Sequence, residues 1–363
     1  VCAECFLVQL EAVATPEDIF SDYAYFSSYS DSWLEHARAY SDAVVERFGL
    51  TDKSWVVEIA SNDGYLLQFF VSRGVQVLGI EPAANVAQAA VQKAIPTMVC
   101  FFGADTARDV VQQHRQADLI IANNVLAHVP DLNGFVRGIK LLLDKKGVST
   151  LEFPHLMRLI QENQFDTIYH EHFSYFSLVT IRQLFTRHGL KVFDVDELTT
   201  HGGSLRIYAA HEDDDSKPVG ERVHELLLRE KQAGITDLRR YLAFVEQVKE
   251  TKSKFLKFLR VAKDEQKSVV GYGAPAKGNT LLNYCAVAKD LIAYTVDRSP
   301  HKQGRFLPGT RIPIYSPDRI METKPDYLLI LPWNLKDEIM DQMKCIKKWN
   351  GRFVVPIPEL KLY

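Results

Sequence analysis

Trp55-Val-Val-Glu-Ile-Ala-Ser-Asn-Asp-Gly64 is a short apolar run followed by a turn sequence that contains a glycine. The run predicts a buried strand, and the apolar residues 65–70 after the turn predict a helix. Further strands are predicted over 75–80, 118–122 and 147–153. Because strands that alternate with helices in this way form parallel sheets, we expect an α/β domain built on a parallel sheet.

Polar residues stand at the ends of the predicted strands, where parallel sheets bind their ligands. Glu81 ends the second strand, and a carboxylate there can accept hydrogen bonds from both hydroxyls of a ribose. Ala60 stands where a dinucleotide-binding turn has its first glycine, so S-adenosylmethionine (SAM) fits this turn better than NAD. We therefore predict a SAM site formed by Glu58, Ala60, Asn62, Gly64, Glu81, Pro82, Asn123 and Asn124.

A second glycine-rich turn, Gly271-Tyr-Gly-Ala-Pro-Ala-Lys-Gly278, follows a predicted strand over 267–271 and opens a helix. Exposed amides and the helix dipole at such a turn favour phosphate. Strands predicted over 291–297, 326–333 and 352–357 complete a second, smaller α/β domain. Between the two domains, residues 219–265 are periodic and polar, which predicts one or two long amphipathic helices.

Tyr169-His-Glu-His-Phe-Ser-Tyr175 lies between the two predicted domains and combines imidazoles, a carboxylate and phenols. Its acid and base groups suggest the place where two bound molecules react. A metal site is an alternative, since His170 and His172 would face the same way on a strand, but the pattern is not HExxH and no third ligand is apparent. The histidines could also be core residues. His155 and His201 are structural or substrate-contact candidates.

Gly202-Gly203 can let the backbone approach a ligand closely, and Ser204 and Arg206 beside them can bind phosphate. A plain β-turn is the alternative. Upstream, the aromatic segment 17–33 can cover a ligand with a tyrosine such as Tyr23, or it can be a packed connector.

Cys2 and Cys5 form a CxxC pair, which is half of the ligand set of a structural zinc site. The missing pair of ligands could lie upstream of this sequence. The alternative is a pair without a metal.

The composition excludes several classes of protein. The chain has 363 residues, of which 47% are hydrophobic and 25% charged, with a formal net charge of −3. This length favours two large domains, and this charge does not indicate binding to nucleic acid or to an anionic membrane. No apolar run is long enough to span a bilayer, and no signal peptide is apparent. Five scattered cysteines argue against a disulfide framework, so we expect a cytoplasmic protein.

Taken together and in this order, the motifs resemble those of the SAM-dependent C-methyltransferases that act on nucleotide-linked deoxysugars in antibiotic sugar biosynthesis. The resemblance covers essentially the whole chain and rests on residues 2–10, 57–66, 169–175, 201–206 and 271–279. It implies a zinc module with four cysteine ligands, a central Rossmann-like SAM domain and a C-terminal Rossmann-like domain that helps hold the nucleotide-sugar. This sequence has only one CxxC pair, and it has Ala60 where the family often has glycine.

The resemblance also implies a division of the chain and a substrate. The expected parts are a zinc module and aromatic connector over 1–30, a SAM domain over 31–210, a helical linker over 211–265 and a nucleotide-sugar domain over 266–363. The expected substrate is a nucleotide-linked 4-keto-deoxysugar, most simply linked to thymidine diphosphate (TDP), bound by a monomer or weak oligomer. The substrate-binding residues would be His201, Gly203, Ser204, Arg206, Tyr272, Gly273, Ala274, Lys277 and Asn279, and the zinc ligands Cys2 and Cys5.

C-methylation needs a carbon nucleophile, which an enolate next to the ketone provides. The resemblance assigns His172 as the base, Tyr169 as the hydrogen-bond donor to the enolate oxygen and Glu171 as an assisting group, and Tyr23 is a candidate for an additional donor. Two other functions stay open at this point. One is O-methylation of a sugar, and the other is a regulatory protein that binds a nucleotide or coenzyme A and has a degenerate SAM domain.

Overall fold

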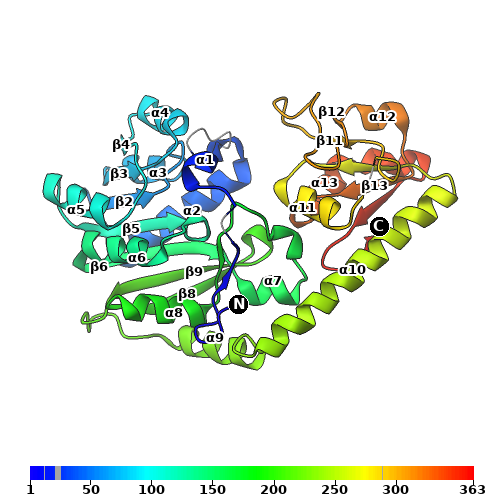
Figure 1. Cartoon of the computed structure of the whole chain (residues 1–363). Coiled ribbons are helices and arrows are strands. Elements are labelled where there is room, and N and C mark those ends of the chain that lie inside the picture. The colour runs from blue at the N-terminus through cyan, green and yellow to red at the C-terminus, as the bar shows by residue number, and fades with distance from the viewer. Residues whose placement is uncertain (12, 21–25, 288) are drawn as a thin grey trace. The chain divides into compact units, whose positions relative to one another are not determined.

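The strand predicted at the start of the first sheet is β2 (Trp55–Ile59), and all its residues are buried. Figure 1 shows it in the computed structural model, which describes residues 1–11, 13–20, 26–287 and 289–363. β2 belongs to a seven-stranded sheet with the order β4-β3-β2-β5-β6-β9-β8, in which β9 runs antiparallel to both of its neighbours. The other strands are β3 (Gln76–Ile80), β4 (Thr97–Met98), β5 (Ala117–Asn123), β6 (Leu143–Pro154), β8 (Leu190–Leu198) and β9 (Ser204–His211).

The strand order locates a crevice in this sheet. The chain adds β3 and β4 on one side of β2 and then β5 and β6 on the other side. Ligands of open parallel sheets bind where the order reverses in this way, outside the carboxyl ends of the strands. The predicted α/β fold with a parallel sheet is therefore confirmed, and its crevice lies between the residues that follow β2 and β5.

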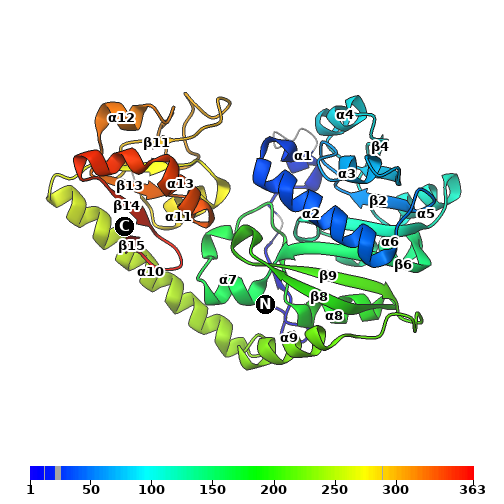
Figure 2. The ribbon, with the colours of Figure 1, turned by 180° about the vertical axis from the view of Figure 1, so that it is seen from behind.

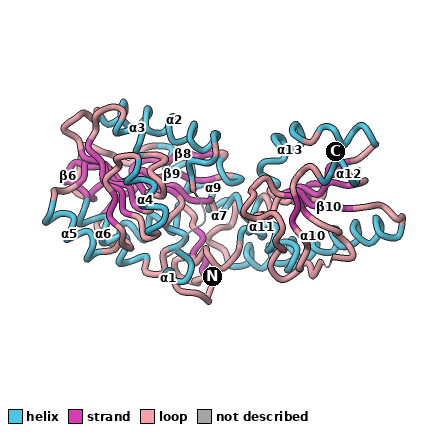
Figure 3. The backbone as a smooth tube through the Cα atoms, turned by 90° about the horizontal axis from the view of Figure 1, so that it is seen from above, coloured by secondary structure: helices cyan, strands magenta, loops and turns pink. Residues whose placement is uncertain are grey.

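Helices cover both faces of the sheet. Figure 3 shows α2 and α3 on one side of the strands and α5 and α6 on the other. The helices around this sheet are α2 (Asp31–Phe48), α3 (Leu67–Val71), α4 (Ala84–Gln92), α5 (Ala104–Gln113), α6 (Leu132–Leu142), α8 (Leu178–Arg187) and α9 (Glu221–Gln232). The short helix α1 (Pro16–Phe20) precedes α2 in the chain. The strands β1 (Val8–Gln9) and β7 (Ser174–Tyr175) pair with each other in a separate two-stranded sheet.

α2 shows how local sequence sets the ends and the buried face of a helix. The hydroxyl of Ser30 accepts a hydrogen bond from the Trp33 amide at 3.3 Å, and Gly49 ends the helix with a φ of 60°. Ala37, Tyr40 and Val44 recur at helical spacing, and all three are buried in the core of the sheet.

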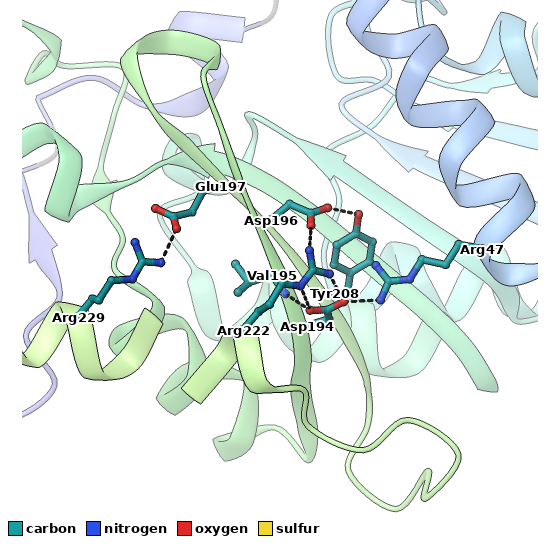
Figure 4. Close-up of polar contacts among 8 residues, drawn as sticks. All are labelled: Arg47, Asp194, Val195, Asp196, Glu197, Tyr208, Arg222 and Arg229. Carbon is teal, nitrogen blue, oxygen red and sulfur yellow. Dashed lines mark hydrogen bonds and ion pairs between the residues drawn. The ribbon is translucent and has the colours of Figure 1, made fainter. Parts of the chain in front are cut away.

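The far edge of the sheet is fixed to two helices by charged groups, as Figure 4 shows. Asp194 of β8 accepts from Arg47 at the end of α2 and from Arg222 of α9. The Tyr208 hydroxyl of β9 donates to Asp196 at 2.6 Å, and the Arg47 guanidinium lies 4.3 Å from the centre of the Tyr208 ring. These contacts tie α2 and α9 to the β8–β9 hairpin.

A second sheet has six strands in the order β12-β11-β10-β13-β14-β15. Its strands are β10 (Val269–Tyr272), β11 (Thr295–Val296), β12 (Ile314–Tyr315), β13 (Tyr327–Ile330), β14 (Arg352–Val355) and β15 (Lys361–Leu362), of which β15 is antiparallel to β14. The strand order reverses between β10 and β13, so this sheet also has a crevice of the kind found in the first.

The remaining helices differ greatly in length. They are α7 (Leu156–Gln161), α10 (Leu238–Asp264), α11 (Ala276–Tyr284), α12 (Arg319–Thr323) and α13 (Lys336–Gln342). α10 packs on the sheet through Phe255 and Leu259, which are fully buried, and Figure 2 shows it running alongside β14 and β15. None of the described helices is both long enough and apolar enough to cross a membrane.

The chain forms two compact units, each made of two segments. Unit 1 comprises residues 1–156 and 170–236, and unit 2 comprises residues 157–169 and 237–363. The helices predicted over 219–265 are present, but α9 belongs to unit 1 and α10 to unit 2, where the resemblance implied a separate linker. The division also falls inside residues 169–175, which we call the reactive stretch. It lies between Tyr169 and His170.

Candidate active site

The turn after β2 folds back onto the end of β3. The amides of Ala60 and Ser61 both donate to the carbonyl of Ile80, at 2.7 and 3.2 Å. Ala60 has a φ of 56°, a left-handed conformation that glycine adopts with less strain. Gly64 has a φ of 75°, which favours glycine, and a Cβ there would lie 2.3 Å from Cδ1 of Ile95, so any other residue would be strained and would force the Ile95 side chain to shift.

Glu81 is held firmly at the carboxyl end of β3. Its Oε2 accepts from the Asn62 amide and its Oε1 from the Ala83 amide, each at 2.9 Å. Burial raises the pKa of Glu81, and these two amides oppose that rise. The carboxylate therefore has a fixed orientation at the carboxyl end of β3.

Two further carboxylates are buried beside it. Oε2 of Glu58 and Oδ1 of Asp63 have no hydrogen-bond partner among the described residues. Burial and the carboxylates of Glu81 and Asp63 raise the pKa of Glu58 well above its ordinary range. Lys93 supplies one compensating charge, with its Nζ 3.2 Å from Oδ2 of Asp63. Such a group of buried acids favours a ligand that carries positive charge, as SAM does on its sulfonium and ammonium groups.

The structure brings the other predicted SAM residues to the same edge of the sheet. Pro82 follows Glu81. Asn123 ends β5, which pairs directly with β2, and Asn124 follows it. Asn124 has a φ of 55°, and its amide donates to the carbonyl of Glu152 at 2.7 Å. Oδ1 of Asn123 and Nδ2 of Asn124 have no partner in the part of the chain that the structure describes, so both can meet a ligand.

Two residues of the aromatic segment 17–33 are attached to this turn. The Ser27 amide donates to Oδ1 of Asn62 at 2.9 Å, and the Ser28 hydroxyl donates to Oδ2 of Asp63. The sequence analysis did not find Ser27, Ser28 or Lys93. Tyr23 lies outside the described residues.

His172 lies next to a second histidine that the sequence analysis missed. The rings of His128 and His172 are 4.9 Å apart, edge to face, and Nδ1 of His128 donates to the carbonyl of Glu171 at 2.7 Å. Burial lowers the pKa of His128 to about 4, so it is neutral at neutral pH. The amide of Phe173 donates to the carbonyl of Ala127 at 2.7 Å. These contacts hold the stretch from His170 onward against the residues that follow β5.

The reactive stretch forms a turn before β7, and this removes the argument for a metal site at His170 and His172. Residues 169–173 are not in a strand, so the same-face argument for His170 and His172 does not apply. Among the described residues, no group of three His, Cys, Asp or Glu side chains is arranged to hold a metal ion. His170 is exposed, whereas Glu171 and His172 are half-buried, and burial raises the pKa of Glu171.

Arg206 lies in a buried ion cluster of unit 1. Its guanidinium is 2.9 Å from Oε2 of Glu152, which also accepts from Nε2 of His36 at 3.0 Å. Burial opposes ionisation of Glu152, but His36 and Arg206 outweigh it, and the pKa of Glu152 is lowered. Phosphate binding by Arg206 stays a prediction, and a phosphate would share the guanidinium with Glu152. The sequence analysis found neither Glu152 nor His36.

The other predicted substrate residues near Arg206 surround a tight turn. His201 has a φ of 53° and Gly203 a φ of 118°, and the Gly203 carbonyl accepts from the His155 amide at 3.0 Å. Ser204 is buried and donates through its hydroxyl to the Thr200 carbonyl at 3.0 Å. The structure therefore has a turn at Gly202-Gly203, and the close approach of a ligand to this turn stays a prediction.

In unit 2, the predicted glycine turn lies at the crevice between β10 and β13. Gly273 has a φ of 89°, and a Cβ there would be 2.6 Å from Cδ of Pro332, which follows β13. Lys277 stands in the first turn of α11, with its Nζ 2.8 Å from Oδ1 of Asn334 and 4.6 Å from the centre of the Trp333 ring. Ala274 lies in the same turn, Asn279 in α11, and Tyr272 ends β10.

A buried acid that the sequence analysis missed completes this group. Asp166 is fully buried, and its Oδ2 accepts from Nε1 of Trp333 at 2.8 Å. Burial raises the pKa of Asp166 to about 7, against the opposing charge of Lys277. Burial also lowers the pKa of Lys277, which the Asp166 charge opposes. Nearby, Oδ1 of Asn279 has no partner among the described residues.

Cys2 and Cys5 lie in one turn near the start of the chain. The amide of Phe6 donates to the Cys2 carbonyl at 3.1 Å, which closes the turn. The amides of Cys5 and Glu4, followed by the Cys5 thiol, lower the pKa of Cys2. Zinc binding by this pair stays a prediction.

Comparison with known proteins agrees with this geometry. Residues 33–195 match the model of a methyltransferase domain, and residues 199–358 match that of a C-methyltransferase C-terminal domain. The C-methyltransferase NovU of Streptomyces niveus is 40% identical over 359 residues, which cover 99% of this chain and 85% of NovU.

Solved structures resemble about half of the chain. One is magnesium protoporphyrin IX methyltransferase of Synechocystis with bound SAH, which is 16% identical. The match covers 49% of this chain and 83% of the methyltransferase chain, with a TM-score of 0.39. Another is the glycopeptide N-methyltransferase MtfA, which is 12% identical. The match covers 48% of this chain and 96% of the MtfA chain, also with a TM-score of 0.39.

Proposed function

This chain belongs to the C-methyltransferase family, and from that premise we propose that it methylates the carbon next to the ketone of a nucleotide-linked 4-keto-deoxysugar. The methyl donor we propose is SAM. The observation that supports this proposal is that the strand order reverses once in each sheet, where parallel sheets bind ligands, and that residues 169–175, with their acid and base groups, span the boundary between the two units in the sequence.

We propose that unit 1 holds SAM at the carboxyl ends of β2, β3 and β5. Glu81 would accept hydrogen bonds from the ribose hydroxyls, because its carboxylate is already oriented by two amides. Glu58 and Asp63 would offset the positive charge of the ligand, since each has an oxygen without a partner among the described residues. SAM, when bound, supplies an electrophilic methyl group on a sulfonium.

The residues of the reactive stretch would make the substrate carbon nucleophilic. A hydrogen on the carbon next to a ketone is acidic, and His172 would remove it, because an imidazole titrates near neutral pH. Tyr169 would donate a hydrogen bond to the enolate oxygen, where charge develops. Glu171 would orient or assist the base, and Tyr23 is proposed as an additional donor. The position of His172 beside His128 supports this role, since the neutral His128 adds no positive charge that would oppose protonation of the base.

The nucleotide part of the substrate would bind to unit 2. The turn at Gly273 and Ala274, together with Lys277, offers amides and a cation at the start of α11, as diphosphates require. We propose thymidine diphosphate as the carrier, with Tyr272 and Asn279 as further contacts. The turn from His201 to Arg206 in unit 1 is proposed as the remaining substrate contact.

One reaction tests the proposal directly. The chain is incubated with SAM and a TDP-linked 4-keto-deoxysugar, and the products are analysed by mass spectrometry and NMR. We expect one added methyl group on the carbon next to the ketone. In deuterated water without SAM, the same position should exchange its hydrogen, because the enolate forms reversibly. A methyl group on a hydroxyl oxygen without exchange would refute C-methylation, and no methyl transfer at all would refute the substrate.

Binding of SAM can be measured separately by calorimetry. Glu81→Gln should weaken SAM binding about tenfold or more, since hydrogen bonds to a charged group are lost. Glu35→Gln, an exposed change on α2, should bind SAM like the unaltered chain. Equal affinity in all three would exclude Glu81 from the site.

Three smaller proposals accompany this function. Cys2 and Cys5 are proposed as two ligands of a structural zinc ion, and the zinc content of the purified chain and of a Cys5→Ser variant tests this. A zinc content that does not change with Cys5→Ser would contradict it. A cytoplasmic location and a monomer or weak oligomer complete the proposal.

A further inference from the structure

Asp297 occupies a defined position in unit 2 that the proposed function has not used. It follows directly after β11, the strand next to β10 in the second sheet. Its Oδ2 accepts from the Ala274 amide at 2.8 Å, and its Oδ1 accepts from the Ser299 amide at 2.9 Å. Ala274 belongs to the glycine turn after β10, so the carboxylate reaches across to the turn where a diphosphate would bind.

Glu81 in unit 1 has the same set of contacts. It follows directly after β3, the strand next to β2, and one of its oxygens accepts from the Asn62 amide in the turn after β2. Its other oxygen accepts from Ala83, two residues further along the chain. Asp297 likewise bonds an amide of the neighbouring turn and the amide two residues further on. The two units therefore place an acid in the same way, although they differ in size and in sequence.

The position has a known physical meaning in sheets of this kind. Both sheets add their second and third strands on one side of the first and the next strands on the other. In that arrangement, an acid at the end of the second strand reaches the hydroxyls of a ribose whose phosphates lie at the first turn. A carboxylate offers about four acceptor sites, so the two amides leave room for a hydroxyl donor.

The surroundings of Asp297 leave its carboxylate accessible to a ligand. Its side chain is 14% exposed, and Nζ of Lys302 lies 3.3 Å from Oδ2. Lys302 also donates to the Ala274 carbonyl at 3.2 Å, which links the cation to the same turn. The carboxylate is thus oriented and charge-balanced, and it is not sealed from a ligand.

We propose that Asp297 binds the furanose of the nucleoside diphosphate in unit 2, by accepting a hydrogen bond from its 3′-hydroxyl and, in a ribonucleotide, from its 2′-hydroxyl. This rests on the proposed function, which gives unit 2 the nucleotide part of the substrate. The inference adds a residue that binds the sugar of the nucleotide. Asp297 follows β11, which lies on the opposite side of β10 from β13.

Calorimetry with two nucleotides tests the proposal. Thymidine diphosphate carries the 3′-hydroxyl, and 3′-deoxythymidine diphosphate lacks it. The unaltered chain should bind the first about tenfold or more tightly than the second, because the hydrogen bond from the hydroxyl to a charged acceptor is lost. Asp297→Asn should reduce this ratio strongly, and Asp290→Asn, an exposed change in the same unit, should keep it. Thermal melting of each variant shows whether it is folded.

The outcomes separate this inference from the function beneath it. If Asp297 only shapes the turn, Asp297→Asn weakens both nucleotides by the same factor, and the inference is wrong. It is also wrong if the unaltered chain binds both nucleotides equally. If the unaltered chain binds neither nucleotide, the assignment of the nucleotide to unit 2 fails, and with it the proposed substrate.

Discussion

The indole Nε1 of Trp333 donates a hydrogen bond over 2.8 Å to Oδ2 of Asp166, a carboxylate that is fully buried. The contact joins the residues after β13 to the short segment that leads to Tyr169. Phe165 of that segment packs in the core of unit 2, with its ring 5.3 Å from that of Tyr284. The residues just before Tyr169 are therefore anchored to the sheet of unit 2.

Asp166 should make the stability of the protein depend on pH. Burial raises its pKa from 3.8 to about 7, so the folded state holds this proton more tightly than the unfolded state does. The resulting stability is fully present below about pH 4 and is lost as the pH rises to about 7, by up to about 4 kcal/mol. Asp166→Asn should flatten this dependence in urea titrations across that window, whereas Asp264→Asn, an exposed change, should not. An equal slope in both variants would contradict the assignment.

His172→Asn should lower turnover about 10²–10⁴-fold, because the base is removed, and it should leave SAM binding intact. His170→Asn is a matched control, since His170 is exposed two residues away in the same turn. Single-turnover rates and SAM calorimetry give the comparison. Near-normal turnover in His172→Asn would remove this residue from the role of base.

Glu230 should be the most costly single acid to remove from unit 1. Its Oε1 is 2.7 Å from both the Leu178 amide and Nε2 of His155, and its Oε2 accepts from the Val179 amide at 2.8 Å. Glu230→Ala leaves the start of α8 and a buried imidazole without their partner, and should cost about 3–5 kcal/mol of unfolding free energy. Glu225→Ala, an exposed change on the same helix, should cost under about 1 kcal/mol. Similar urea midpoints for the two variants would show that the buried pair adds little.

Ala60 and Gly64 should respond in opposite directions when alanine and glycine are exchanged. Ala60→Gly relieves a left-handed alanine and should raise the unfolding free energy by up to about 1 kcal/mol. Gly64→Ala places a Cβ 2.3 Å from Ile95 and should destabilise the turn and weaken SAM binding. Thermal melting and SAM calorimetry measure both effects. A loss of SAM affinity in Ala60→Gly would mean that the alanine itself contacts the ligand.

Local sequence predicts the elements that local interactions form. β2 has the bounds expected from its apolar run, and α3 lies close to the helix expected from the apolar residues 65–70. The strand expected over 291–297 is reduced to Thr295–Val296, because β11 pairs only with the second half of the short strand β10. Its length is set by a neighbour, and composition does not show this.

The residues missed in the candidate site are those whose role depends on distant partners. His128 gains its meaning from Glu171 and His172, and Asp166 from Trp333, which is far away in the sequence. Glu152 looks like an ordinary strand residue until Arg206 and His36 are placed beside it. Motifs mark turns and unusual spacings, whereas a buried acid gives no local signal.

The interleaving of the two units restricts how this enzyme can be recombined. Residues 157–169 fold with residues 237–363, and the polypeptide crosses between the units three times. A hybrid that takes one unit from a relative must therefore exchange two separate pieces together. The junction at Tyr169 and His170 would then bring a phenol from one parent and an imidazole from the other. A single crossover anywhere in the gene divides at least one of the two cores.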